Sequence, residues 1–239
     1  MDNGSPQQGA PEIVLRIPGR WKSPAALAAA LPSGFTLSRD CLALPDGAAV
    51  EFLPLPPDAE FPSIFASACG RHRTRRGRRA VQRYAVNACL VAPGGSVDAA
   101  RRAMDAATGL LDAGGLGVFV DNGLVAHEMR RWREIVEPLD AASIFLGLVG
   151  VLRGERELWT VGMHVMGRCE VVVPRTDDVS RDETALFEFV EYACTPDASI
   201  ANGDFFESGH RRARVAGRPC TRFRADSPPF NPFGEWVLE

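Results

Sequence analysis

Three polar side chains in the second half of the chain have types suited to acid–base chemistry. Asp121 belongs to the turn signal Asp121-Asn122-Gly123, His127 begins the helical pattern HEMRRWREIV, and His164 lies between two glycines in TVGMHVMG. A histidine beside a carboxylate can transfer protons near neutral pH. Such work requires the fold to bring the three together. The alternative, which the local patterns favour, is a turn-capping aspartate and an exposed histidine at a helix start.

Recognised catalytic, metal and cofactor motifs are absent from the sequence. HEMRR resembles the start of a zinc-protease helix, but Arg131 occupies the place of the second histidine. No serine stands in a G-x-S-x-G elbow, and no glycine-rich phosphate loop precedes Lys22, the only lysine. The six cysteines form no C-x-x-C pair. We therefore predict no catalytic residue, no metal site and no cofactor.

A run of arginines in the first half is the strongest charge feature. Seven guanidinium groups and no acid lie between positions 71 and 83: Arg71, Arg73, Arg75, Arg76, Arg78, Arg79 and Arg83. Such a tract can bind phosphates or other anions. Only Tyr84 is available nearby for base stacking, and Gly77 interrupts a helix. We therefore favour an exposed, mobile loop, with nucleic-acid binding as the weaker alternative.

Composition describes an ordinary globular protein. Hydrophobic residues make up 46% and charged residues 24% of the 239 residues, and the net charge is −3. That balance argues against binding of nucleic acid by the chain as a whole. The polar N-terminus does not resemble a signal peptide, and no apolar stretch is long enough to span a membrane. With cysteines expected to be free thiols, we predict a bacterial cytoplasmic protein without membrane contact.

The first half alternates short strands and helices. EIVLRI (12–17) is typical of a strand, Ser23-Pro24 begins a helix, and Pro45-Asp46-Gly47 predicts a hairpin turn. A helical stretch and the strand YAVNACLVA follow. The order β-α-β-β-α-β is ferredoxin-like.

The second half begins with a helix from Ser96 to about Leu111. IFLGLVGVLR is continuously apolar and predicts a central strand with residues 144–152 buried on both faces. Further strands and the helix ETALFEFVEYAC follow. We predict an α+β fold with a mostly antiparallel, mixed sheet, helices mainly on one face and two ferredoxin-like-ordered halves. Residues 1–11 are predicted to be disordered, and 12–239 to form a single domain with halves of about 12–93 and 94–239.

Four segments follow one another as in a known family: GGLGVFVDNGLVAHEMRRW, LWTVGMHVMGRCEVVVP, ETALFEFVEYA and PFNPFGEWVLE. They resemble an uncharacterised bacterial family of α+β proteins described as a domain of unknown function. The likeness covers roughly residues 85–239, and Leu158–Met163 and Glu170–Pro174 carry it best. The arginine tract departs from the family pattern. The resemblance implies an α+β fold and implies no activity.

Three functions remain open at this point. We expect a non-catalytic binding or interaction module whose partner is another protein. The first alternative is a small hydrolase or transferase with a polar site at Asp121, His127 and His164. The weaker alternative is an RNA-associated protein that uses the tract from Arg71 to Arg83. Convergence of the three polar side chains favours the enzyme, and their dispersal beside an exposed apolar patch favours the interaction module.

Overall fold

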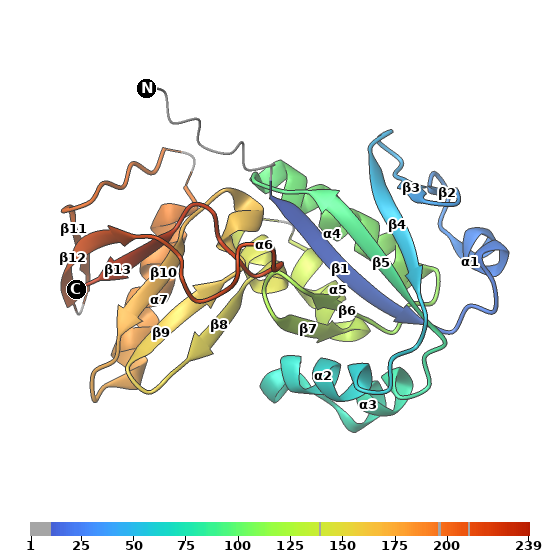
Figure 1. Cartoon of the computed structure of the whole chain (residues 1–239), viewed down its shortest axis with the longest axis horizontal. Helices are drawn as coiled ribbons and strands as arrows, with labels where there is room; N and C mark the ends of the chain where they lie inside the picture. Colours follow the sequence, from blue (N-terminus) through green and yellow to red (C-terminus); the bar gives the residue numbers. More distant parts are fainter. Residues whose placement is uncertain (1–10, 139, 196, 210) are drawn as a thin grey trace.

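The protein contains two mostly antiparallel sheets that lie side by side along its long axis (Figure 1). The computed structural model describes residues 11–138, 140–195, 197–209 and 211–239. Helices make up 34% and strands 29% of the structure. The predicted α+β class and the mostly antiparallel pairing are confirmed, although the strands form two sheets where the sequence suggested one. Of the predicted disordered segment 1–11, all but Pro11 lies outside the described residues.

The first sheet has seven strands in the order β2-β3-β4-β5-β1-β6-β7, and all of its pairs are antiparallel. Its strands are β1 (Glu12–Gly19), β2 (Thr36–Leu37), β3 (Cys41–Ala43), β4 (Ala49–Leu55), β5 (Val86–Pro93), β6 (Gly117–Val120) and β7 (Val125–Glu128). Along the chain the first half departs from the expected order β-α-β-β-α-β, because three strands, β2, β3 and β4, follow α1, and α3 follows α2 before β5. In the sheet, β5 lies between β4 and β1 and pairs antiparallel with both. A ferredoxin-like fold is built from split βαβ units, in which two parallel strands have another strand between them.

The second sheet has six strands in the order β11-β12-β13-β10-β9-β8, and within the described residues only β10 and β13 pair in parallel. Its strands are β8 (Gly150–Arg153), β9 (Glu157–Val161), β10 (Glu170–Pro174), β11 (Phe205–Ser208), β12 (Arg211–Arg218) and β13 (Glu235–Leu238). Helix α7 (Val179–Ala193) packs against β9, β10 and β11. On the other face, Arg222 lies 4.6 Å above the Trp159 ring.

Helices cover both faces of the first sheet. α4 (Val97–Asp112) packs on β1 and β5 and contacts α5 (Met129–Val136) and α6 (Ala141–Leu148). α2 (Phe61–Ala68) packs near β7 on the opposite face, with α3 (Arg75–Val81) beside it. The alternation of β6 separates the two layers, since Val118 and Val120 join the main core while Phe119 joins the smaller cluster around Phe61. α1 (Pro24–Ala30) and the 3-10 turns η1 (Gly70–His72) and η2 (Met163–Met166) complete the list.

The prediction of a central strand in IFLGLVGVLR is wrong. Residues 141–148 form helix α6, and the strand that follows, β8, is an edge strand. The Asp140 carboxylate accepts a hydrogen bond from the Ser143 backbone N–H at 2.8 Å and so begins the helix. A continuous apolar run fits a buried helix as well as a buried strand. Leu146 is 46% exposed and Val151 is 36% exposed, so the run is also not buried throughout.

The predicted arginine loop is also wrong, although its exposure is as expected. Arg75–Val81 form α3, which continues through Gly77. The Thr74 side chain caps it by accepting a hydrogen bond from the Gly77 N–H at 2.9 Å. A Cβ at position 77 would overlap the Glu128 carboxylate, so the absence of a side chain gives room to a neighbouring acid.

One continuous core runs through both sheets. The main cluster of buried residues includes Leu15 and Leu90 of the first sheet, Met104 of α4 and Val171 and Val173 of the second sheet. Backbones approach closely where the sheets meet, because a Cβ on Gly123 would overlap the Leu148 carbonyl and one on Gly162 would lie 2.9 Å from the same oxygen. Gly162 has φ +107°, which also favours glycine.

Candidate functional site

Asp121, the carboxylate predicted for a polar site, is engaged in an ion pair. Both of its oxygens accept hydrogen bonds from the Arg16 guanidinium, each at 2.8 Å. Burial raises the pKa of Asp121 above its usual value, and the Arg16 partner opposes that shift. The pair joins the end of β6 to the centre of β1 and leaves no free carboxylate oxygen for substrate chemistry.

His127 is held between β7 and α6. Its Nε2 lies 3.0 Å from the Gly147 carbonyl oxygen, and its ring packs against Trp132 with centroids 5.8 Å apart. Burial lowers the pKa of His127 to about 4, because a charged imidazole would lose its hydration there. The neutral ring donates to a helix carbonyl, which is a structural role.

His164 belongs to a different, fully buried group of polar side chains. Its Nε2 is 3.0 Å from the Asn122 amide nitrogen, and its Nδ1 is 3.6 Å from the Glu170 carboxylate. Glu170 also accepts hydrogen bonds from Thr160, from Asn231 and from the backbone N–H groups of Gly162 and Met163, over 2.7–3.0 Å. The carboxylate therefore fixes the turn from β9 into η2.

A cleft of about 480 Å³ opens above Asn122 and His164. Pro11, Glu12 and Val14 form one wall, and residues 225–228, Phe230 and Pro232 form the other. The Asn122 side chain accepts from the Val14 N–H and donates to the carbonyls of Glu12 and Pro228, at 2.7–3.0 Å. These bonds tie the two walls together, so the amide is occupied by structural contacts.

The structure therefore brings His164 together with Asn122 and Glu170 and gives Asp121 and His127 separate partners. Within the described residues the three predicted side chains share no hydrogen bond. No group of three histidine, cysteine or acidic side chains in that part of the chain could hold a metal ion. Glu170 was missed at the sequence level, although a single acid at the head of the apolar strand EVVVP signals a buried, paired carboxylate.

Across the described ranges, no helix combines the length and apolar character needed to cross a membrane.

An apolar groove lies between α6 and α7, and we call it the α6–α7 groove. Its volume is about 570 Å³. Its lining residues are Asp140, Ala141, Ala142, Phe145, Leu146, Phe187, Val190, Glu191, Cys194 and Thr195. Leu146 is 46% exposed and Phe187 45% exposed.

Leu146 of α6 and Phe187 of α7 are exposed because each helix buries only one face in the core. On α7, Leu186, Phe189 and Val190 are buried, and Phe187 lies at the edge of that buried face, beside Val190 in the groove. The Phe187 ring meets the Phe145 ring edge to face, with centroids 5.9 Å apart. This contact fixes Phe187 at the groove without covering it.

Both charged residues that line the groove are acids, and the Arg168 guanidinium reaches its edge, where it donates to the Thr195 carbonyl at 3.3 Å. Asp140 and Glu191 are exposed at its rim, and no lysine or arginine is among the lining residues. Hydrogen bonds from Ser143 lower the pKa of Asp140, so its carboxylate is ionised at neutral pH. Burial raises the pKa of the Cys194 thiol, which keeps that lining residue neutral.

Comparison with models of known families, with curated proteins and with solved structures finds no match. The family resemblance of the four segments stays an interpretation of those motifs.

Proposed function

We propose that this protein is a non-catalytic binding module that takes up a helix of a partner protein in the α6–α7 groove. The observation that carries the proposal is the pair of large, exposed apolar side chains, Leu146 and Phe187, in a concave apolar surface. Exposed apolar patches in a groove are typical of protein-binding sites.

The groove favours one kind of occupant. An amphipathic helix can place apolar side chains at i, i+3 and i+4 between α6 and α7. Asp140 and Glu191 at the rim favour lysine or arginine beside that apolar stripe, because unlike charges attract and like charges repel across an interface. The partner we propose is therefore a basic amphipathic helix.

Catalysis by Asp121, His127 and His164 has less support, because each of these side chains has its own structural partner. We infer a cytoplasmic location from the six cysteines, which are all free thiols in the structure.

Fluorescence anisotropy with a labelled peptide of about 18 residues, built from leucine and lysine on opposite helix faces, tests the proposal. We expect saturable binding that the double variant Leu146→Ser/Phe187→Ser weakens at least about tenfold, which corresponds to two buried apolar contacts. A leucine–glutamate peptide of the same pattern should not compete for the groove.

The matched control is Ile64→Ser/Phe205→Ser, which removes two exposed apolar side chains outside the groove. It should bind the lysine peptide as the parent protein does. Equal binding by parent and groove variant contradicts the proposal. Dimers of the parent that the groove substitutions dissociate, seen by sedimentation, would instead assign the groove to a second copy of the chain.

A further inference from the structure

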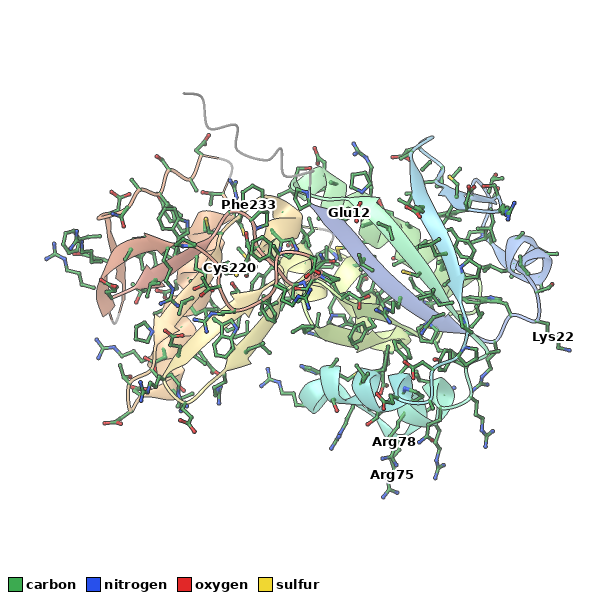
Figure 2. All side chains as sticks on the ribbon, viewed as in Figure 1. Glu12, Lys22, Arg75, Arg78, Cys220 and Phe233 are labelled. Carbon is green, nitrogen blue, oxygen red and sulfur yellow. The ribbon has the colours of Figure 1, made fainter. Side chains whose placement is uncertain are left out.

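The arginine tract forms an exposed surface along η1 and α3, and none of its residues lines the α6–α7 groove. Arg71, Arg73, Arg75, Arg76, Arg78, Arg79 and Arg83 are all exposed, and Arg75 and Arg78 extend into solvent (Figure 2). We call this set the arginine face. Within the described residues none of the seven forms an ion pair with a carboxylate, whereas Arg130, Arg153, Arg212 and Arg224 elsewhere each do.

Helix α3 has one face that packs on the protein and one face that is exposed to solvent. Val81 is 1% exposed in the cluster with Phe61, Phe65 and Tyr84, and Gly77 and Ala80 are half-buried on the same side. At 3.6 residues per turn the remaining positions, which are all arginines, project outward. The guanidinium groups therefore share one surface.

Contacts at both ends hold this surface in place. The Glu128 carboxylate accepts hydrogen bonds from the Thr74 N–H and hydroxyl, each at 2.6 Å, at the start of α3. At the other end the Arg20 guanidinium donates to the Ala80 carbonyl at 2.9 Å. The nearby acid Glu134 pairs with Arg130 and Arg131 of its own helix. The Glu128 carboxylate is thus used to fix the backbone at the start of α3.

We propose that the arginine face binds the phosphate backbone of a double-stranded nucleic acid without reading its sequence. Arginine presents a planar fork that matches a phosphate, and neutralised phosphates release counterions into solution. Like charges held together without acids repel one another, and a polyanion removes that repulsion. This binding site is separate from the α6–α7 groove.

Two observations favour a duplex over other polyanions. Residues 70–83 expose no phenylalanine, tyrosine or tryptophan on which an unpaired base could stack, and His72 is the exposed imidazole of this segment. The adjacent Tyr84 is 8% exposed with its hydroxyl bonded to Asp58. The same residues expose no large apolar side chain, which both a membrane surface and a protein interface would use as an anchor.

The test measures binding to labelled DNA and RNA duplexes of about 20 base pairs, roughly two helical turns. For the parent protein we expect affinity to fall steeply between about 50 and 200 mM salt. The variant Arg75→Gln/Arg76→Gln/Arg78→Gln/Arg79→Gln should bind at least about 100-fold more weakly at the lower salt. Its log–log salt slope should be smaller by about 3 to 4, since each phosphate contact contributes about 0.9.

The control Arg130→Gln/Arg153→Gln/Arg212→Gln/Arg224→Gln also loses four positive charges, but from arginines that have carboxylate partners. It should keep most of the duplex affinity. Equal losses in the two variants, or tighter binding to phosphatidylserine vesicles than to either duplex, would overturn the proposal. Thermal melting establishes that both variants fold, and the groove variant Leu146→Ser/Phe187→Ser should bind duplexes unchanged.

Discussion

Single polar residues in this protein serve mainly to hold segments together. Asn122 bonds to β1 and to the Pro228 carbonyl, and Glu170 gathers four donors from β9, η2 and Asn231. A buried carboxylate is tolerated only when donors replace its hydration, and Glu170 has them. The charges best placed for chemistry are thus used for architecture, which is consistent with binding through surfaces.

His127 allows a test of this structural role through pH. Burial holds its pKa at about 4 in the folded protein, while an unfolded chain takes up the proton near the ordinary value of about 6.5. The folded state therefore binds fewer protons between these values. Its contribution to the free energy of unfolding is present above pH 6.5 and is lost as pH falls toward 4, to an upper limit of about 3 kcal/mol.

Denaturant unfolding of the parent and of His127→Gln at pH values from about 7 to 4 measures this contribution. Glutamine can donate to the Gly147 carbonyl and does not titrate, so the variant should lose less stability over this range. Other acids titrate equally in both proteins and cancel in the difference. Parallel stability curves would show that His127 is not protected from protonation by the fold.

At the residue scale, sequence reasoning identified His164 and Asp121 as polar residues of interest but not their partners. Arg16, which pairs with Asp121, precedes it by 105 positions, and Asn231, which contacts Glu170, follows it by 61. Partners this distant are set by strand pairing, which a single sequence does not reveal. Local signals such as the Asp-Asn-Gly turn predict the secondary structure in which a side chain lies, but they do not predict its tertiary contacts.

At the scale of elements, α6 shows where periodicity fails as a guide. Its core contacts come from Ile144, Phe145 and Leu148, while Leu146 is exposed in the groove. The exposed leucine completes an unbroken apolar run, and so the residue that lines the groove hides the amphipathic pattern of the helix. The helix at 97–112 was predictable because its outward positions are polar.

Positions 146 and 148 provide a direct test of the helix. On a strand they would share one face, whereas on a helix they lie about 200° apart. Leu148 is 0% exposed and Leu146 is 46% exposed. Leu148→Asp should lower the stability by several kcal/mol, because an unpaired charge is buried. Leu146→Asp should change it by less than about 1 kcal/mol.

Melting temperature and soluble yield of the two variants decide between the arrangements. Both substitutions add the same charge, so each is the control for the other. Equal destabilisation of the two proteins would mean that residues 144–152 form the strand that the apolar run suggests.

At the scale of the whole molecule, the boundary between the halves is not a boundary between the sheets. Residues after 94 supply α4, β6 and β7 to the first sheet before the chain enters the second. The Gly95 N–H donates to the Val165 carbonyl at 2.9 Å, and Gly123 lies against Gly150 and Gly162. Because the main core is shared, opening either sheet would expose buried side chains of the other.

We therefore predict that residues 12–239 unfold as one cooperative unit, and the tryptophans report on this. Trp21 and Trp132 pack with the first sheet and its helices, while Trp159 and Trp236 lie on β9 and β13. Two variants, Trp21→Phe/Trp132→Phe and Trp159→Phe/Trp236→Phe, leave fluorescence from one sheet each. In each variant the denaturant midpoint from fluorescence should equal that from far-UV circular dichroism, as two-state unfolding requires. Comparison within a variant removes the effect of the substitutions on stability. A fluorescence midpoint that differs from the dichroism midpoint in either variant would mean that the sheets unfold separately, and the single-domain prediction would fail.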